Sequence, residues 1–172
     1  NIEFYTDVLG LRFVKKTVNF DDPSTYHLYF GNETGEPGTA LTFFAFEGAQ
    51  SGTVGRGQVS GVTFAAPEAA IDYWAGRLRD HDLEVTGPKE RFGEQVLSFN
   101  DPDGHPLEII GSPQDLPPWE DDDVPAEHAL RGFHSVTLNS WQPSATKDAL
   151  DVMGYDQTRQ AGDRSRYRAS ND

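Results

Sequence analysis

The sequence predicts an α+β fold built from repeated βαβββ modules that form cupped mixed sheets. The first observation is a repeat, because a helical pattern followed by three strand-like segments fills residues 1–46 and recurs over residues 67–110. The second is a hairpin, since residues 100–104 (NDPDG) have the chemistry of a tight turn and separate two apolar runs. Both observations indicate that antiparallel strands follow each helix.

The first module is expected over residues 1–50. An amphipathic helix is predicted to end before Gly10, because glycine is favoured just after helix C-termini. The helix is expected over residues 1–9, with strands over residues 11–20, 25–30 and 40–46. This module has no opening strand before its helix, and the chain has no initial Met. We therefore expect a chain that is cut from a longer protein at both ends.

The second module is expected over residues 56–113. Its helix has Ile71, Trp74 and Leu78 on one face and begins with the Pro-Glu pair that favours a first helical turn. The expected elements are a strand over residues 59–65, a helix over 67–81, and strands over 85–92, 94–99 and 106–110. This order gives one complete βαβββ module.

A linker and a third module are expected after the second one. Residues 114–130 are rich in proline and acidic side chains, which predicts a linker. Residues 131–172 then begin a third module, with a strand over residues 131–138 and a helix over residues 144–153. This module is predicted to be truncated near its second or third strand.

Charge and composition limit the classes of partner. The chain has 172 residues, with 28 acidic and 14 basic side chains and a formal charge of -14. Nucleic acid and anionic membranes are unlikely partners, because phosphate binding needs clustered Lys and Arg. There is no cysteine and no apolar run of about 20 residues, so we expect a cytoplasmic protein. The acidic excess is typical either of salt-loving organisms or of an ordinary acidic protein.

Glu108 is the candidate functional residue that stands out from the local pattern. It lies in the strand predicted after the turn, on one face with Pro106 and Ile110 and with apolar neighbours on both sides. A carboxylate in such surroundings must be solvated, paired or bound to a metal. Two interpretations remain open: a solvent-facing strand residue, or a metal ligand on the inner face of a cupped sheet.

These motifs resemble the vicinal oxygen chelate superfamily, which includes glyoxalase I, bleomycin-resistance proteins and extradiol dioxygenases. The shared features are Phe-Tyr…Leu-Gly-Leu around the first helix and Asp-Pro-Asp-Gly…Leu-Glu-Ile on the last hairpin. The block FYTDVLGLRFVKKTVNFDDPSTYHLYF and the later EHALRGFHSVTL resemble the four-module dioxygenases that open hydroquinones. The resemblance implies a non-haem Fe(II) enzyme that cleaves a hydroquinone- or catechol-like ring with O₂.

The resemblance also assigns positions to metal ligands. Superfamily ligands are usually a His on the first strand of a module and a Glu on its last strand, which correspond here to His134 and Glu108. Gly61 occupies the first-strand position of the second module, and the first module's last strand offers only Thr42 and Phe44. The resemblance implies that the principal ligands are a His on the missing opening strand and a His and a Glu of a fourth module, all outside the chain. Glu108 and His134 are then expected to form either a degenerate site or a functional one.

The resemblance further implies a cofactor and substrate contacts. The metal would be Fe(II), or alternatively Mn(II), held by two His and one carboxylate with an open face for the ring and O₂. This chain alone is expected not to bind it and to be inactive. His27 and Tyr29 share a strand face and are candidates for substrate binding, although a partly exposed polar face is an equal alternative. A homo-oligomer is a further expectation.

Two other functions compete with the dioxygenase hypothesis. A metal-free module of the same superfamily would sequester a small molecule in its cup, but would consist of two complete modules. A glyoxalase-type metal isomerase would need ligands at Gly61 and on the first module's last strand, where the sequence has none. The dioxygenase hypothesis is preferred for these reasons.

Overall fold

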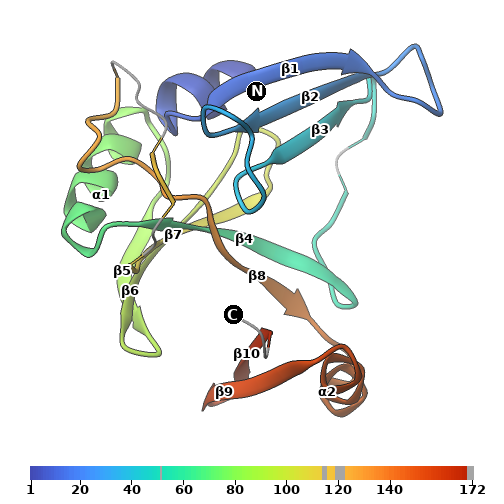
Figure 1. Ribbon diagram of the computed structural model, residues 1–172, viewed down its shortest axis with the longest axis vertical. Coiled ribbons are helices and arrows are strands. Elements are labelled where there is room, and N and C mark those ends of the chain that lie inside the picture. Colours follow the sequence, from blue (N-terminus) through green and yellow to red (C-terminus); the bar gives the residue numbers. More distant parts are fainter. Residues whose placement is uncertain (51, 114–115, 119–122, 170–172) are drawn as a thin grey trace.

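The computed structural model describes residues 1–50, 52–113, 116–118 and 123–169 (Figure 1). Its elements in chain order are η1 (Phe4–Val8, a π-helix), β1 (Arg12–Val18), β2 (Tyr26–Gly31), β3 (Leu41–Ala45), β4 (Gln58–Ala66), η2 (Glu68–Ala70, a 3₁₀-helix), α1 (Ile71–Asp80), β5 (Thr86–Arg91), β6 (Glu94–Asn100), β7 (Pro106–Gly111), β8 (Phe133–Asn139), α2 (Pro143–Val152), β9 (Tyr155–Ala161) and β10 (Arg164–Ala169). The predicted α+β class with mixed sheets is confirmed. No helix within the described ranges is long and apolar enough to cross a membrane.

The first sheet consists of β1, β2 and β3 in that order, all antiparallel. One face packs against η1, where the ring of Tyr5 lies 5.2 Å from that of Phe30 and 4.8 Å from that of Phe43. Because side chains alternate along β2, His27 and Tyr29 lie on the other face. The sheet therefore has an apolar face on the core and a face with polar and aromatic side chains.

The second sheet has five strands in the order β5-β6-β7-β4-β8. β4 is parallel to β7, and this parallel pair is possible because α1 lies in the crossover that follows β4. The apolar face of α1 is buried against the sheet through Ile71, Trp74, Ala75 and Leu78. β8 adds to β4 in antiparallel fashion and so joins residues of the predicted third module to the second.

β9 and β10 form a separate two-stranded sheet beside α2 (Figure 1). All residues of α2 are at least partly exposed. A hydrogen-bonded ion pair from Arg166 of β10 to Glu94 of β6 links this hairpin to the five-stranded sheet. The Arg166 guanidinium also lies 4.9 Å from the ring centroid of Phe92. A charged contact therefore connects the hairpin to the larger sheet.

The turn between β6 and β7 connects the two larger sheets through a buried carboxylate. Asp101 is 4% exposed, and its Oδ1 accepts hydrogen bonds from the backbone N–H groups of Asp103 and His105. Its Oδ2 accepts one from the hydroxyl of Tyr5 at 2.7 Å. Burial, with the bond to Asp101 and the charge of that carboxylate, raises the pKa of Tyr5 far above its usual value. Tyr5 therefore stays protonated and donates.

Replacing Tyr5 by Phe should lower the free energy of unfolding by about 1–3 kcal/mol, because a buried carboxylate oxygen loses its hydrogen bond. Urea denaturation followed by circular dichroism measures the change. Tyr26→Phe is the matched control, since Tyr26 is 49% exposed and should change stability by less than about 0.5 kcal/mol. Equal effects of the two substitutions would contradict this role for Tyr5.

Part of the segment expected as a linker is packed into the core. Val124 and Leu130 are buried, and the indole N–H of Trp74 donates to the carbonyl of His128 at 2.8 Å. Gly10 has φ +65, and a Cβ there would lie 2.7 Å from Cγ2 of Val124, so only glycine suits this position. Residues 114–115 and 119–122 of the predicted linker lie outside the described residues.

Candidate functional site

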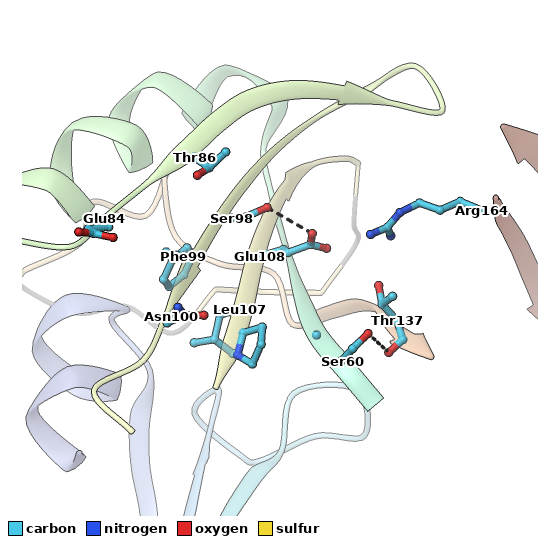
Figure 2. A pocket seen from close by; sticks show the side chains of 12 residues that line it. Ser60, Glu84, Thr86, Ser98, Phe99, Asn100, Leu107, Glu108, Thr137 and Arg164 are labelled. Atoms are coloured by element: carbon cyan, nitrogen blue, oxygen red, sulfur yellow. Dashed lines mark hydrogen bonds between the residues drawn. The ribbon is translucent and has the colours of Figure 1, made fainter. Parts of the chain in front are cut away.

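The candidate site lies on the face of the five-stranded sheet that points away from α1 (Figure 2). We call it the cup face and define it by Thr63 of β4, Ser98 of β6 and Glu108 of β7. Leu107 and Ile109 are buried in the core, which forces Glu108 to the opposite face. The strand register places Thr63 and Ser98 directly beside Glu108. The predicted alternation along this strand is confirmed.

Both carboxylate oxygens of Glu108 have hydrogen-bond donors. Arg91 of β5 binds them in bidentate fashion, with Nη1–Oε1 at 2.9 Å and Nη2–Oε2 at 2.6 Å. Thr63 donates to Oε2 at 2.8 Å and Ser98 to Oε1 at 3.3 Å. The side chains of Arg91 and Glu108 are 18% and 14% exposed. The carboxylate is therefore neither in bulk solvent nor unpaired.

The charge state of Glu108 follows from these contacts. Burial alone would favour the neutral acid. The hydrogen bonds from Arg91 and Thr63, and the positive charges of Arg91 and Arg164, outweigh burial and lower the pKa of Glu108 below its ordinary value. Glu108 is therefore ionised at neutral pH and forms a charge-neutral pair with Arg91.

His134 of β8 has different partners. Its Nε2 lies 3.5 Å from Oε1 of Glu94, and its Nδ1 lies 2.9 Å from the hydroxyl of Ser135. Burial lowers the pKa of His134, and the charges of Arg166 and Arg91 add to this effect, whereas Glu94 opposes it. His134 is therefore neutral at pH 7 and lies beside the Glu94–Arg166 pair.

Acidification should lower the free energy of unfolding in two steps. The pKa of His134 in the folded chain lies below the ordinary 6.5. As the pH drops, His134 is therefore protonated in the unfolded chain before it is protonated in the folded chain, and the free energy of unfolding falls below about pH 6.5. The pKa of Glu108 lies below the ordinary 4.5, which gives a second loss below about pH 4.5. Urea titrations between pH 8 and 3 measure both steps.

The His134→Gln variant should lose the first step and keep the second. His81→Gln is the matched control, because His81 is exposed beyond the end of α1. A stability that does not change between pH 7.5 and 5.5 in the unmodified chain would contradict the assignment to His134.

The two predicted metal ligands are thus engaged by protein groups. Arg91 places a cation on the carboxylate where a metal ion would need to bind, and like charges at this distance repel. Within the described ranges, no three His, Cys, Asp or Glu side chains come together as a metal centre. The arrangement around Glu108 therefore does not fit a metal ion.

The predicted substrate contacts lie on the first sheet. The hydroxyl of Tyr29 is 2.8 Å from Nδ1 of His27, and the His27 ring is within 4.2 Å of the rings of Tyr29 and Phe44. Nε2 of His27 is buried and has no hydrogen-bond partner among the described residues. These side chains form a compact aromatic cluster on the face away from η1.

Sequence reasoning missed Arg91, Glu94 and Arg166. Strand alternation identifies which face of a strand a residue occupies, but not which strands are neighbours. Arg91 reaches Glu108 across β6, so the pair depends on the strand order β5-β6-β7. The available signal was a basic residue beside the Phe92-Gly93 turn, which by itself indicates only an exposed hairpin end.

The repeated modules and their cupped sheets indicate the superfamily predicted from the sequence, and comparison with known proteins gives the same result. Residues 1–109 match the model of the Glyoxalase/Bleomycin resistance protein/Dioxygenase superfamily. The chain belongs to this superfamily. The predicted membership is confirmed.

Two relatives narrow the class. A protein of Bacillus subtilis named as a ring-cleaving dioxygenase, MhqO, is 46% identical over 100% of this chain and 55% of its own length. The chlorohydroquinone/hydroquinone 1,2-dioxygenase of Sphingobium indicum is 44% identical over 81% of this chain and 46% of its own length. The chain spans about half the length of these relatives. Its close homologues are ring-cleaving dioxygenases.

A solved structure supports the same relationship. The crystal structure of a Bacillus subtilis protein described as a dioxygenase is 46% identical and superposes with a TM-score of 0.91. The match covers 98% of this chain and 55% of that chain. The backbone arrangement described above is therefore shared with this relative.

Proposed function

We propose that this chain is part of a non-haem Fe(II) ring-cleaving dioxygenase that opens a hydroquinone- or catechol-like ring with O₂. The observation that carries the proposal is the 46% identity to MhqO over the whole chain. The 44% identity to a hydroquinone 1,2-dioxygenase supports the substrate class. A ring hydroxyl can bind a metal ion, which stabilises its anion. The cytoplasmic location stays a prediction.

We propose that the iron ligands belong to those parts of the relatives that this chain does not span. The support is the arrangement around Glu108, where Arg91 fills the place of a cation, together with the half-length coverage. Glu108 and His134 then form a degenerate cup. Mn(II) is the alternative metal, as predicted from the sequence. In this proposal the 172-residue chain by itself binds neither metal with useful affinity and is inactive.

We propose His27 and Tyr29 as residues that contact the aromatic substrate. Their rings and that of Phe44 lie in contact, tilted by 33° and 36° to the His27 ring, and offer aromatic surface against which a substrate ring can pack. The unpartnered Nε2 of His27 supplies a hydrogen-bonding group for a ring hydroxyl. The module repeat supports this role, because the same face of the second module carries Glu108.

Oxygen uptake tests the proposed function. A protein that carries this chain within the full length of its relatives, supplied with Fe(II), should consume O₂ with hydroquinone at about 1 s⁻¹ or faster. Phenol is the matched substrate control, because it lacks the second hydroxyl, and should support no uptake. The 172-residue chain alone should also be inactive. Turnover by that chain alone would show that the ligands lie within it, and no turnover by the longer protein would contradict the function.

A further inference from the structure

A cavity lies on the cup face between the five-stranded sheet and the β9–β10 hairpin (Figure 2). Its volume is ≈ 270 Å³, which exceeds the roughly 150 Å³ that is enough to hold a benzene molecule. Ser60, Thr137, Pro106 and Leu107 are among the residues that line it. The cavity therefore has hydroxyl groups, the apolar ring of Pro106 and room for a single substituted ring.

Arg164 gives this cavity an unbalanced positive charge. Figure 2 shows its side chain pointing from β10 toward Glu108 across the cavity. Glu108 is already paired with Arg91, and within the part of the chain that the structure describes the Arg164 side chain makes no hydrogen bond or ion pair, although its charge acts on Glu108 through space. Glu84 lies at the opposite end of the cavity, away from Arg164. The Arg164 end is therefore the end that favours an anion.

Gly61 keeps the cavity open. It lines the cavity on β4, and a Cβ built there would meet only Pro106 O at 3.9 Å and Cβ of Thr137 at 4.0 Å. These are ordinary van der Waals distances, so close packing does not require glycine at this position. The absence of a side chain leaves space beside Pro106 and Thr137 that a larger residue would fill.

We propose that this cavity binds a small hydroxylated carboxylate, with the carboxylate on Arg164 and the ring or carbon chain over Pro106. A guanidinium binds a carboxylate in a planar, bidentate geometry, and the hydroxyl groups of Ser60 and Thr137 suit hydroxyl substituents. The site is separate from the aromatic cluster of His27 and Tyr29 on the first sheet. Glu108 lines the site with its charge already paired by Arg91, and the site needs no metal.

A pair of probes that differ by one carboxylate tests the proposal. Isothermal titration calorimetry should show 2,5-dihydroxybenzoate binding at least tenfold more tightly than hydroquinone to the unmodified chain. Arg164→Gln should abolish this preference, because it removes the charge and keeps a polar side chain. Arg159→Gln on the same hairpin should keep it, since Arg159 is exposed and does not line the cavity.

Two substitutions of Gly61 test the location without changing charge. Gly61→Ala should preserve binding, whereas Gly61→Leu should fill the cavity and lower the affinity at least tenfold, with circular dichroism confirming that both variants fold. Equal affinity for the two probes, no binding of the carboxylate, or a preference that survives Arg164→Gln would overturn the proposal. Oxygen uptake does not depend on these residues in our proposal, so the proposed function can fail or succeed independently.

Discussion

Trp74→Ala should lower the free energy of unfolding by about 3–5 kcal/mol, the range found when large aromatic side chains are removed from cores. Trp74 is 0% exposed and belongs to the core between α1 and the five-stranded sheet. The substitution leaves a cavity behind the strands that position Glu108. It also removes the hydrogen bond that holds the carbonyl of His128, so residues 123–130 should lose part of their attachment.

Denaturation followed by circular dichroism measures this loss. Trp141→Ala is the matched control, because Trp141 is 69% exposed and its removal should cost less than about 0.5 kcal/mol. Trp74→Phe separates the contribution of core packing from that of the hydrogen bond to His128, since it retains most of the buried aromatic surface and loses the indole N–H donor. A loss below about 1.5 kcal/mol for Trp74→Ala would contradict the packing described for α1.

Arg91→Ala should lower the free energy of unfolding by about 3 kcal/mol, because it leaves an ionised carboxylate largely buried without its cation. Thr63 and Ser98 would still donate to Glu108, which keeps the effect at the lower end of the range for broken buried pairs. Lys147→Ala is the matched control. It breaks an exposed ion pair with Asp151, with both side chains 44% exposed, and should cost less than about 0.5 kcal/mol.

A double substitution distinguishes an ion pair from simple packing. If the cost of Arg91→Ala comes from the uncompensated charge of Glu108, Arg91→Ala combined with Glu108→Gln should recover a large part of it. Urea titrations of the two single variants and the double variant measure this coupling. Additive losses would show that Arg91 stabilises the cup face through its hydrocarbon chain alone.

The sequence was sufficient for the elements and the class of fold, because those depend on local periodicity. The apolar spacing of Ile71, Trp74 and Leu78 predicted α1, and the alternation around Glu108 predicted its face on β7. The turn was predicted from residues 100–104, and the structure adds that Asp101 also binds Tyr5 of the first helix. The hydrogen bond between Tyr5 and Asp101 joins residues 96 positions apart. No local sequence pattern encodes such a contact between two modules.

The partners of the candidate site residues could not be predicted for the same reason. The partly buried carboxylate of Glu108 requires a positive partner, and from the sequence alone a metal ion and a basic side chain satisfy that requirement equally well. The choice depends on Arg91, which lies two strands away in a sheet whose order becomes clear only in three dimensions. The packing of Val124 and Leu130 was missed because the surrounding residues are polar and proline-rich.

Ring cleavage with labelled oxygen is the most direct test of the proposed function. The longer protein that carries this chain, supplied with Fe(II), hydroquinone and ¹⁸O₂, should form a ring-opened carboxylic acid that contains both oxygen atoms of one O₂ molecule. Mass spectrometry of the product in unlabelled water measures this directly. Incorporation of two ¹⁸O atoms into an open-chain product is the result we predict, and recovery of an intact ring or of an unlabelled product would contradict the proposal.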